Sequence, residues 1–572
     1  MSFLAKNVVS RFFFFNTAGC KTACLYSYFC GMPFLKVEQK ISGTYLRIAE
    51  SYRDAEGKSR HRIVHSLGKV QDYTPEQLRS IGIKLFELGG GDVKALLDGS
   101  LEEMGRYNYG YRQVYHKALS HYGLDKLLER LGRKHKLSYN LCDAVMVMLL
   151  ERLQEPASKR SNYIHQTDYV GLEPVYLQHL YRSLDRLADN NQLIQQHIFN
   201  TGRDLFNQQL DVVFYDVTTL YFESSKESEA ANQGLRRKGF SKDGKVGDTQ
   251  ILFCMMIDRQ KRPIGYQVFK GDTYEGHTLP QALKKLKDRY SIDKVIVVAD
   301  RGMMNKDNIT AVGENGFEFI IGDRLKNMSP TIRGELTDLA SYQYEWVYTD
   351  NDNEKVLIRY TTLQHQGKTI IATYSSKRAA KDKHDRETLL QKATTLLDKP
   401  DLLKKKASRF YLKQTGTEQY QIDEQRIKNS ERYDGFLAIS TNNTTLPLTE
   451  VLDQYKHLFQ IEHTFRTFKS HLEMRPMFHW TDKRIEGHIC LCYIAYTLQH
   501  YVLQKLSTFP IPVTEGILRQ MLDHMQVSLL RHNDNKVYLR SAQQAHEVSL
   551  QKSLGLKSLP PIIAQNLLQN YI

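Results

Sequence analysis

Two aspartates lie where a folded chain often places chemically active carboxylates. Asp216 lies within the strand-forming stretch DVVFYDVTTLYF, and Asp300 directly follows the apolar run KVIVVA. Functional groups of parallel α/β sheets gather at the carboxyl ends of strands, so Asp300 is well placed for chemistry. An aspartate at a strand end also often caps the following turn, so neither residue alone identifies a catalytic site.

A third carboxylate, Glu462, lies in the helical stretch Pro447–Leu472. Four polar residues there are separated by 7, 4 and 3 positions, which places them on one face of a continuous helix. They are Tyr455, Glu462, Arg466 and Lys469. An apolar stripe lies beside this face and predicts burial: Leu458, Ile461, Phe465, Phe468 and Leu472. An isolated Glu–Arg pair on a helix surface would stabilise it by only about 0.3–0.5 kcal/mol.

The elements around the two aspartates predict an α/β fold with an RNase H-like mixed sheet. Three strands come first and would be antiparallel, and helix-linked parallel strands follow. The predicted strands are Asp211–Phe222, Thr249–Asp258, Pro263–Phe269, Lys294–Ala299 and Phe317–Ile321, with helices over His277–Tyr290 and Asn305–Asn315. This first part of the core spans residues 206–325.

The next stretch, residues 326–446, is predicted to be a β-rich insertion that does not continue the core sheet. Its short strands flank a charged helical stretch, Lys377–Leu397. The predicted strands are Tyr342–Tyr348, Lys355–Thr361, Thr369–Tyr374, Phe410–Thr415 and Gly435–Ser440. Residues 447–505 then return to the core with the helix that carries Glu462.

The regions before and after the predicted core and insertion are expected to form separate parts of the protein. Residues 1–31 contain three basic residues, no acidic residue and the run Phe12–Phe15, which resembles a poor signal or transit peptide. We favour a non-native or unstructured extension ahead of Met32. Residues 32–110 predict a small β-hairpin region with a basic second strand, which either contacts DNA or is simply solvated. Residues 111–205 predict a helical domain, and 506–572 a C-terminal helical region.

Composition narrows the classes of function. The 572 residues carry a net charge of +15, which suggests an anionic partner such as nucleic acid. The longest apolar runs, Ala144–Leu150 and Ile489–Leu498, are too short for a membrane span of about 20 residues. Seven cysteines cannot form a disulfide framework, which indicates a reducing compartment. The positive charge concentrates outside the core, with 15 basic and 9 acidic residues in 377–432 against 18 and 17 in 206–325.

The three acidic segments together resemble bacterial insertion-sequence DDE transposases with an interrupted RNase H-like domain. The segments are DVVFYDVTTLYFES, VIVVADRGM and YKHLFQIEHTFRTFK. The third box of that family reads Y-x2-R-x3-E-x6-K, which Tyr455, Glu462 and Lys469 match, whereas Leu458 stands at the arginine position. The phosphate contact of that arginine would have to come from elsewhere in this chain, from Lys456 or Arg466, or be absent. The D-x-G of the second box is met by Asp300 and Gly302.

The resemblance implies a mechanism and its parts. Asp216, Asp300 and Glu462 would be both the catalytic residues and the ligands of two Mg²⁺ ions, for which Mn²⁺ could substitute. Residues expected to contact DNA are Tyr455, Arg466, Lys469 and, as a base-stacking side chain of the insertion, Trp346. The partners would be double-stranded DNA, both the terminal inverted repeats of the element and the target. A homodimer on paired ends, in the cytoplasm at the bacterial nucleoid, is also expected.

Two other functions are compatible with the same residues. One is an RNase H-like nuclease or resolvase that cuts without strand transfer. The other is a transposase-derived DNA-binding protein that has lost catalysis. The three intact carboxylates speak against the second, while the insertion and the chain beyond Glu462 exceed what a minimal nuclease needs.

Overall fold

The computed structural model describes most of the chain as two compact units. One comprises Met1–Met104 with Leu530–Lys536, and the other comprises Gly105–Leu529 with Val537–Ile572. The extension expected at residues 1–31 lies outside the described residues. The described residues are 33–54, 59–89, 102–202, 212–223, 226–227, 234–239, 248–290, 292, 295–303, 305–349, 354–395, 397, 410–416, 419–475, 477–532 and 535–572.

The N-terminal unit is a small antiparallel sheet followed by a helix. The strands β1 (Pro33–Lys40), β2 (Gly43–Arg53) and β3 (Ser59–Lys69) pair in that order. The predicted hairpin of β2 and β3 is confirmed, and β1 is an additional strand. Helix α2 (Pro75–Leu88) begins at Thr74, whose hydroxyl accepts a hydrogen bond from the backbone N–H of Gln77. The loop residues 55–58 lie outside the described part.

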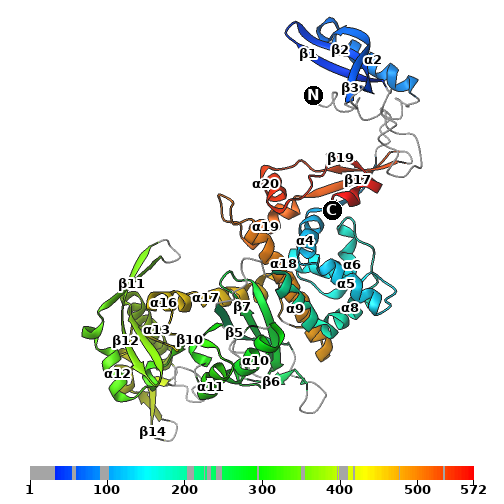
Figure 1. Ribbon diagram of the computed structural model, residues 1–572. Coiled ribbons are helices and arrows are strands. Elements are labelled where there is room, and N and C mark those ends of the chain that lie inside the picture. The colour runs from blue at the N-terminus through cyan, green and yellow to red at the C-terminus, as the bar shows by residue number, and fades with distance from the viewer. Residues whose placement is uncertain are drawn as a thin grey trace. The chain divides into compact units, whose positions relative to one another are not determined.

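One mixed sheet of ten strands organises the larger unit (Figure 1). Its order is β11-β12-β13-β16-β10-β9-β5-β7-β6, with β8 also beside β7. The strands β5, β7 and β8 are antiparallel, and β5, β9 and β10 are parallel, which confirms the predicted RNase H-like order. The core strands are β5 (Val212–Tyr221), β6 (Arg237–Lys238), β7 (Thr249–Ile257), β8 (Pro263–Lys270), β9 (Ile296–Ala299) and β10 (Glu318–Asp323).

Successive residues of β5 and β9 pack into two different cores, one on each face of the sheet. Val213, Tyr215 and Val217 pack with helices α10 (Leu279–Tyr290) and α11 (Lys306–Glu314). Phe214, Leu220 and Phe222 pack in the other core, which contains the apolar side of helix α17 (Phe459–Arg466). We call these sides the α10 face and the α17 face. Both are buried, which explains the unbroken apolar run of β9.

The prediction that the insertion does not continue the core sheet is wrong. β16 pairs with β10 on one side and with β13 on the other, so the strands of the insertion extend the same sheet. The extending strands are β11 (Tyr344–Thr349), β12 (Lys355–His365), β13 (Lys368–Tyr374) and β16 (Phe436–Thr441). Pairing across more than 110 residues between β10 and β16 leaves no mark in the local sequence pattern, which is why the sequence suggested a separate layer.

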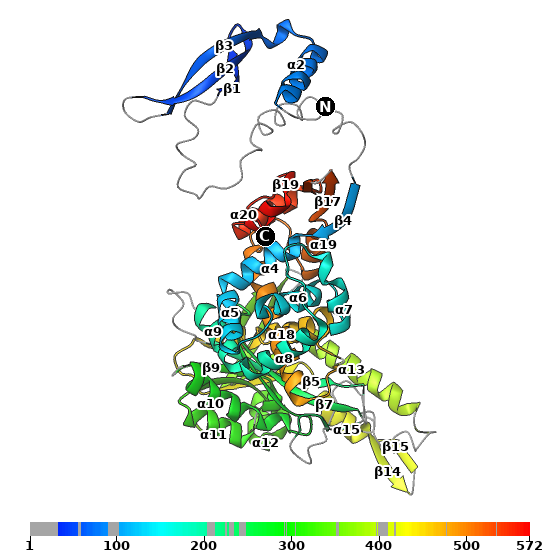
Figure 2. The same cartoon turned by 90° about the vertical axis from the view of Figure 1, so that its right-hand side faces the viewer.

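Only the hairpin of β14 (Leu412–Gly416) and β15 (Gln419–Ile422) lies outside this sheet within the described insertion. Figure 2 shows it beside α13 and α15 at the edge of the unit. The helices here are α12 (Pro330–Thr337), α13 (Ser376–Thr394) and α15 (Glu424–Glu431). A buried ion pair fixes α13 to the chain before β16, since a guanidinium N–H of Arg386 donates to Asp434 at 2.7 Å.

The predicted helical domain is present, and a helix from much later in the chain joins it. Helix α18 (Asp482–Lys505) packs against α4, α6 and α8. It is buried along most of its length and lies among these helices in Figure 1. The helices of the domain are α4 (Gly110–His121), α5 (Leu124–Lys134), α6 (Leu141–Gln154), α7 (Lys159–His165), α8 (Leu177–Asp189) and α9 (Asn191–Gly202). Within the described residues, no helix combines the length and the hydropathy required to cross a bilayer.

The sequence predicted a helical C-terminal region, but the structure has strands there as well as helices. Four strands there form a sheet in the order β19-β18-β17-β4, and Val527, Leu529 and Tyr538 are the side chains of β17 and β18 that are buried. The elements are β4 (Glu102–Asn108), α19 (Glu515–Asp523), β17 (Gln526–His532), β18 (Asn535–Arg540), α20 (Ala545–Leu554) and β19 (Ile562–Ala564).

Candidate active site

The register of two parallel strands brings Asp216 and Asp300 side by side. β5 and β9 pair with Tyr215 opposite Ala299. Asp216 and Asp300 are the next residues of the two strands, and neighbouring strands lie about 4.8 Å apart. Two carboxylates that are 84 positions apart in the sequence therefore stand on adjacent strands at the same height.

Strand alternation directs both carboxylates to the α17 face. Val298 and Phe214, two positions before Asp300 and Asp216, belong to the core on that face, whereas Ala299 and Tyr215 belong to the α10 face. Asp300 is exposed and Asp216 is half-buried. One oxygen of Asp216 accepts a hydrogen bond from the backbone N–H of Val217 at 2.7 Å. The α17 face is thus the side of the sheet on which the third carboxylate must lie.

Helix α17 carries Glu462 onto this face. Its residue Phe465 packs edge-on against Phe253 of β7, with ring centroids 6.0 Å apart, and Phe468 does so at 5.3 Å. Ile461 is fully buried, while the adjacent Glu462 is exposed. The helix contacts both β5 and β7, so its apolar side packs on the sheet. Glu462, on another side of the helix, is exposed to solvent.

The predicted continuous helix around Glu462 is wrong in two places. A tight turn at His457 and Leu458 separates α16 (Leu448–Lys456) from α17, because the N–H groups of Leu458, Gln460 and Ile461 bond three residues back. After α17, Thr467–His471 forms a π-helical turn. Tyr455 therefore belongs to a different helix from Glu462, and Lys469 lies in the wider turn. Hydrophobic periodicity cannot reveal such shifts of one residue, which are frequent at functional sites.

Tyr455 nonetheless reaches the acidic centre. Its hydroxyl lies against Gly322 of β10, in the space that a Cβ there would need, and the backbone nitrogen of Arg301 borders the same space. Burial raises the pKa of Tyr455, and the charges of Asp300 and Glu462 raise it further. The phenol therefore stays protonated and lies within electrostatic reach of two of the three predicted catalytic carboxylates.

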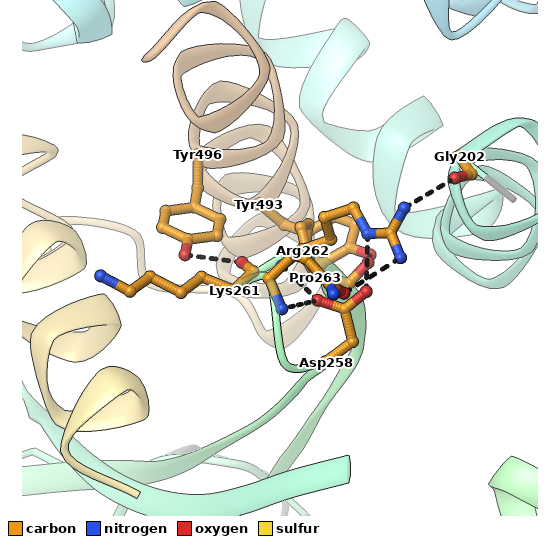
Figure 3. A network of polar contacts seen from close by, with 8 residues as sticks. Gly202, Asp258, Lys261, Arg262, Pro263, Tyr493 and Tyr496 are labelled. Carbon is orange, nitrogen blue, oxygen red and sulfur yellow. Dashed lines mark hydrogen bonds and ion pairs between the residues drawn. The ribbon is translucent and has the colours of Figure 1, made fainter. Parts of the chain in front are cut away.

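A polar network holds α17 against the turn between β7 and β8, and Figure 3 shows the part of it that joins Tyr496 to this turn. The hydroxyls of Thr464, on α17, and Tyr496, on α18, lie 3.0 Å apart. Tyr496 donates to the carbonyl of Lys261 in that turn at 3.1 Å. The turn is fixed by buried Asp258, which accepts hydrogen bonds from the backbone N–H and the side-chain Nε of Arg262.

A second contact fixes the end of the π-helical turn. Arg152 of α6 is buried, and one of its terminal nitrogens donates to the carbonyls of Leu472 and Glu473 at 3.1 and 3.4 Å. A guanidinium at the carboxyl end of a helical segment satisfies carbonyls that lack an intrahelical partner. The helical domain thus positions the segment that follows Glu462.

The other residues of the predicted DNA-contacting helix face lie in different surroundings. Arg466 is exposed, Lys469 is half-buried, and Leu458 is a core residue with 9% of its surface exposed. An apolar contact therefore occupies the position at which the family places an arginine. The sequence singled out Lys456 as a substitute, but its ammonium donates to the carbonyl of Thr349 and lies over the ring of Tyr348.

Trp346, the expected base-stacking side chain of the insertion, is buried. Only 8% of its surface is exposed, and its indole N–H donates to Asp453 of α16 at 3.1 Å. The ring also packs against Tyr348, with centroids 4.7 Å apart. This placement gives Trp346 a structural role between β11 and α16, and stacking on a base would require the indole to leave it.

Sequence reasoning missed two arginines near the acidic centre. The charges of Arg301 and Arg378 act on the phenol of Tyr455 and oppose the rise of its pKa. Arg301 follows Asp300 directly, and Arg378 lies in the first turn of α13, whose N-cap Ser375 accepts from its backbone N–H. Their sequence signals were the DRG tripeptide and the basic start of a helix in the insertion.

The donor chemistry fits divalent cations, because three carboxylates on one face are the hard oxygen ligands that such ions prefer. The side chains do not form a complete coordination shell: among the residues that the structure describes, no group of three His, Cys, Asp or Glu side chains is placed to hold a metal ion. Asp216 and Asp300 form the adjacent pair, and Glu462 comes from the covering helix.

Comparisons with known proteins agree with this architecture. The family model "transposase DDE domain" matches residues 207–498, and the model "IS1634 family transposase, N-terminal domain" matches residues 35–87. The first range contains all three carboxylates, and the second covers β1 to α2 almost completely. The comparison with curated proteins gives no match.

Two solved structures show weaker similarity. The chain is similar to piggyBac transposase in a synaptic complex with hairpin DNA, with 8% identity and a TM-score of 0.35 over 72% of this chain and 76% of that one. It is also similar to Mos1 transposase in a paired-end complex with the left transposon end, with 15% identity and a TM-score of 0.14 over 44% and 68%. Because the DDE-domain model matches half of the chain, the protein belongs to the family of DDE transposases of insertion sequences.

Proposed function

We propose that Asp216, Asp300 and Glu462 form the centre at which this DNA transposase cuts the ends of its element and joins them to target DNA. The observation that carries the proposal is the register of β5 and β9, which puts Asp216 beside Asp300 on the face that α17 covers. Glu462 is exposed on that helix, and the whole arrangement falls within the matched DDE domain.

Transposases of this family use divalent metal ions. We take the ion to be Mg²⁺, with Mn²⁺ as a substitute, because the candidate ligands are carboxylates. Asp216, Asp300 and Glu462 would hold it. When bound, the ions activate the attacking oxygen and stabilise the leaving oxygen of the phosphodiester.

The chain's own residues would orient the DNA for two displacements. Water first attacks the phosphorus at the element end, and the bond to the 3′ oxygen breaks to leave a 3′-hydroxyl. That hydroxyl then attacks a phosphodiester of the target, displacing the 3′ oxygen there, so no covalent bond to the protein forms. Arg301 and Arg378 would neutralise phosphate charge, and Tyr455 keeps its proton to donate to a phosphate oxygen.

DNA outside this centre would be held by the N-terminal unit. Arg60, His61, Arg62 and His65 are exposed along β3, although Arg60 pairs with Asp54 and Arg62 with Glu50. A basic strand of this kind binds phosphates without reading sequence, so affinity should fall steeply with salt. Arg466 and Lys469 would contact backbone near the cut. Pairing two ends requires two protomers, so we also propose a homodimer that acts on bacterial DNA in the cytoplasm.

The test combines the full chain, duplexes cut from both ends of the element, a supercoiled target plasmid and Mg²⁺. We expect Asp216→Asn, Asp300→Asn and Glu462→Gln each to abolish cleavage and joining while end binding in a gel-shift assay survives. Glu314→Gln, which changes an exposed carboxylate of α11 on the opposite face, is the matched control.

The products separate the competing functions. Cut ends without joined plasmid would indicate a nuclease, and binding without any cut would indicate an inactive DNA-binding protein. Full activity of any one of the three carboxylate variants would contradict the assignment of that residue. Light scattering with and without end duplexes tests the homodimer.

A further inference from the structure

Two large aromatic side chains stand exposed on the segment that follows the π-helical turn. Phe478 and Trp480 have 73% and 58% of their surface exposed. Their neighbours turn inward: Met477 is buried, and burial lowers the pKa of His479 to about 3. The alternation presents both rings to solvent from the same side of the segment.

Hydrogen bonds attach both ends of this segment to the core. The N–H of Met477 donates to the carbonyl of Tyr221, at the end of β5, with a distance of 3.2 Å. Asp482, at the start of α18, accepts from the N–H of Leu235 at 3.0 Å. The rings are therefore carried by a fixed support, which reduces the entropy lost when a ligand binds to them.

A buried cation lies under one of the rings. The guanidinium carbon of Arg236 is 4.9 Å from the ring centroid of Trp480 and 5.7 Å from that of Phe222. Arg236 is only 5% exposed, so its guanidinium supports the indole from beneath and does not itself reach solvent. The two exposed rings form an aromatic surface that suits a ligand with flat, polarisable groups.

The aromatic pair lies on the same side of the sheet as the carboxylates. Phe222 follows Asp216 by six positions and packs on the α17 face, which puts Arg236 and Trp480 roughly 20 Å along β5 from Asp216. That is the length of about six nucleotides of duplex. The chain that connects Glu462 with Trp480 carries three basic residues and one acidic residue: Arg466, Lys469, Arg475 and Glu473.

We propose that Phe478 and Trp480 form a stacking platform for unpaired bases of the DNA strand held at the acidic centre, an inference that rests on the proposed function. Aromatic rings stack on any base, and a line of cations follows the backbone, the combination used to bind single strands. Aromatic residues and arginine are also enriched at protein interfaces, so a protein partner is the alternative that the experiments below separate from a DNA strand. The platform would hold strand that is freed from pairing near the cut.

The two tryptophans of the chain allow a direct test. Trp346 is buried and Trp480 is exposed, so Trp346→Phe leaves a single reporter on the platform. We expect its emission to fall at least about twofold on titration with a 20-nucleotide oligo(dT), since stacking quenches indole, and to change less with a blunt 20-base-pair duplex. Unchanged emission while a labelled oligo(dT) binds by anisotropy would overturn the platform. If Trp346→Phe fails to fold, the quenching of Trp480 is obtained by subtracting the emission change of Trp480→Phe from that of the wild type.

Affinity provides an independent measurement on the full chain. Trp480→Ala should weaken oligo(dT) binding about tenfold or more, whereas Trp480→Phe should retain most of the affinity. Phe410→Ala is the matched control, because that ring is equally exposed, at 58%, but lies beside the β14–β15 hairpin. Unaltered oligo(dT) affinity of Trp480→Ala would refute the platform. A change in its oligomeric state without a change in affinity would identify the surface as a protein interface instead.

Failure of the platform can be told apart from failure of the catalytic assignment. The fluorescence titration is made in EDTA, and Asp216→Asn should give the wild-type quench. Cleavage of duplex ends in Mg²⁺ reports the carboxylates separately. Normal quenching without any cleavage would retain the platform and reject the active site, and the reverse result would do the opposite.

Discussion

The hydroxyl of Tyr455 occupies the space beside the Cα of Gly322, so that the two residues fit only because one of them has no side chain. Gly322 lies in β10, next to β9, and Tyr455 comes from α16. Burial and the charges of Asp300 and Glu462 raise the pKa of the phenol, and the charge of Arg301 opposes that rise. The contact between Gly322 and Tyr455 therefore joins β10 to α16, the helix before the one that carries Glu462, close to the acidic centre.

We therefore expect Gly322→Ala to displace Tyr455 and to lower the cleavage rate at least tenfold, with end binding retained. Removing the hydroxyl relieves most of the clash, so the double variant Gly322→Ala with Tyr455→Phe should recover expression and thermal stability relative to Gly322→Ala. Gly313→Ala is the control, since a Cβ there meets no atom within 4 Å and alanine favours the helix. Equal activity of Gly322→Ala and Gly313→Ala would contradict the fit.

Tyr496 joins the helix of Glu462 to the β7–β8 turn, and its hydroxyl can be removed with little change in side-chain volume. Tyr496→Phe should cost about 1 kcal/mol of stability, because the carbonyl of Lys261 loses its donor. The looser α17 should lower kcat several-fold and leave the Kd for end DNA unchanged. Tyr501→Phe, one turn further along α18, is the control, and its ring stacks on His121. A loss of DNA affinity with unchanged kcat would reject the positioning role.

The order of the core strands and helices was predictable because each is a local pattern. The run KVIVVA followed by Asp300, and the β-branched and aromatic stretch around Asp216, predict strands without any knowledge of pairing. Asp216 and Asp300 become neighbours through strand order alone, and an RNase H-like order fixes that. Local pattern and topology together therefore led to two of the three predicted carboxylates.

What could not be predicted depends on distant contacts. β10 pairs with β16 through residues that are 121 positions apart in the sequence, Ile320 and Thr441. No local sequence pattern predicts this pairing. The turn at Leu458 and the π-helical turn shift the helix face by small steps that periodicity averages away. Tryptophan is a residue type that can stack on bases, so the sequence alone did not reveal the burial of Trp346. That burial depends on its contacts with Asp453 and Tyr348 in the folded protein.

Leu458 provides a prediction about the missing family arginine. Leu458→Arg would place a guanidinium at a position that is 9% exposed, within the core that holds Ile461 and Phe465. Burying an unpaired charge costs several kcal/mol, so the variant should be less stable and less active. Leu458→Met keeps the apolar contact and should behave as wild type. A gain of DNA affinity and activity in Leu458→Arg, measured with end duplexes, would mean that the position faces phosphate after all.

Two partly buried histidines should make the fold sensitive to acid. Burial lowers the pKa of His500 to about 4, and that of His116 to about 4 as well, against about 6.5 in an unfolded chain. Below pH 6.5 the unfolded chain therefore takes up protons that the folded protein does not, and the free energy of unfolding decreases as pH falls. Each such histidine contributes a slope of about 1.4 kcal/mol per pH unit down to its folded pKa.

His500→Gln should remove one of these slopes. Thermal unfolding of wild type and variant between pH 4.5 and 8 is the measurement, and we expect the two curves of midpoint against pH to converge as the pH is lowered from about 6.5. His384→Gln changes an exposed histidine of α13 and should leave the wild-type curve unaltered. Because His500 lies on α18 beside Tyr496, with ring centroids 6.0 Å apart, protonation there would also disturb the network that holds α17. Parallel curves for wild type and His500→Gln across this range would show that His500 takes up its proton equally in the folded and unfolded chain.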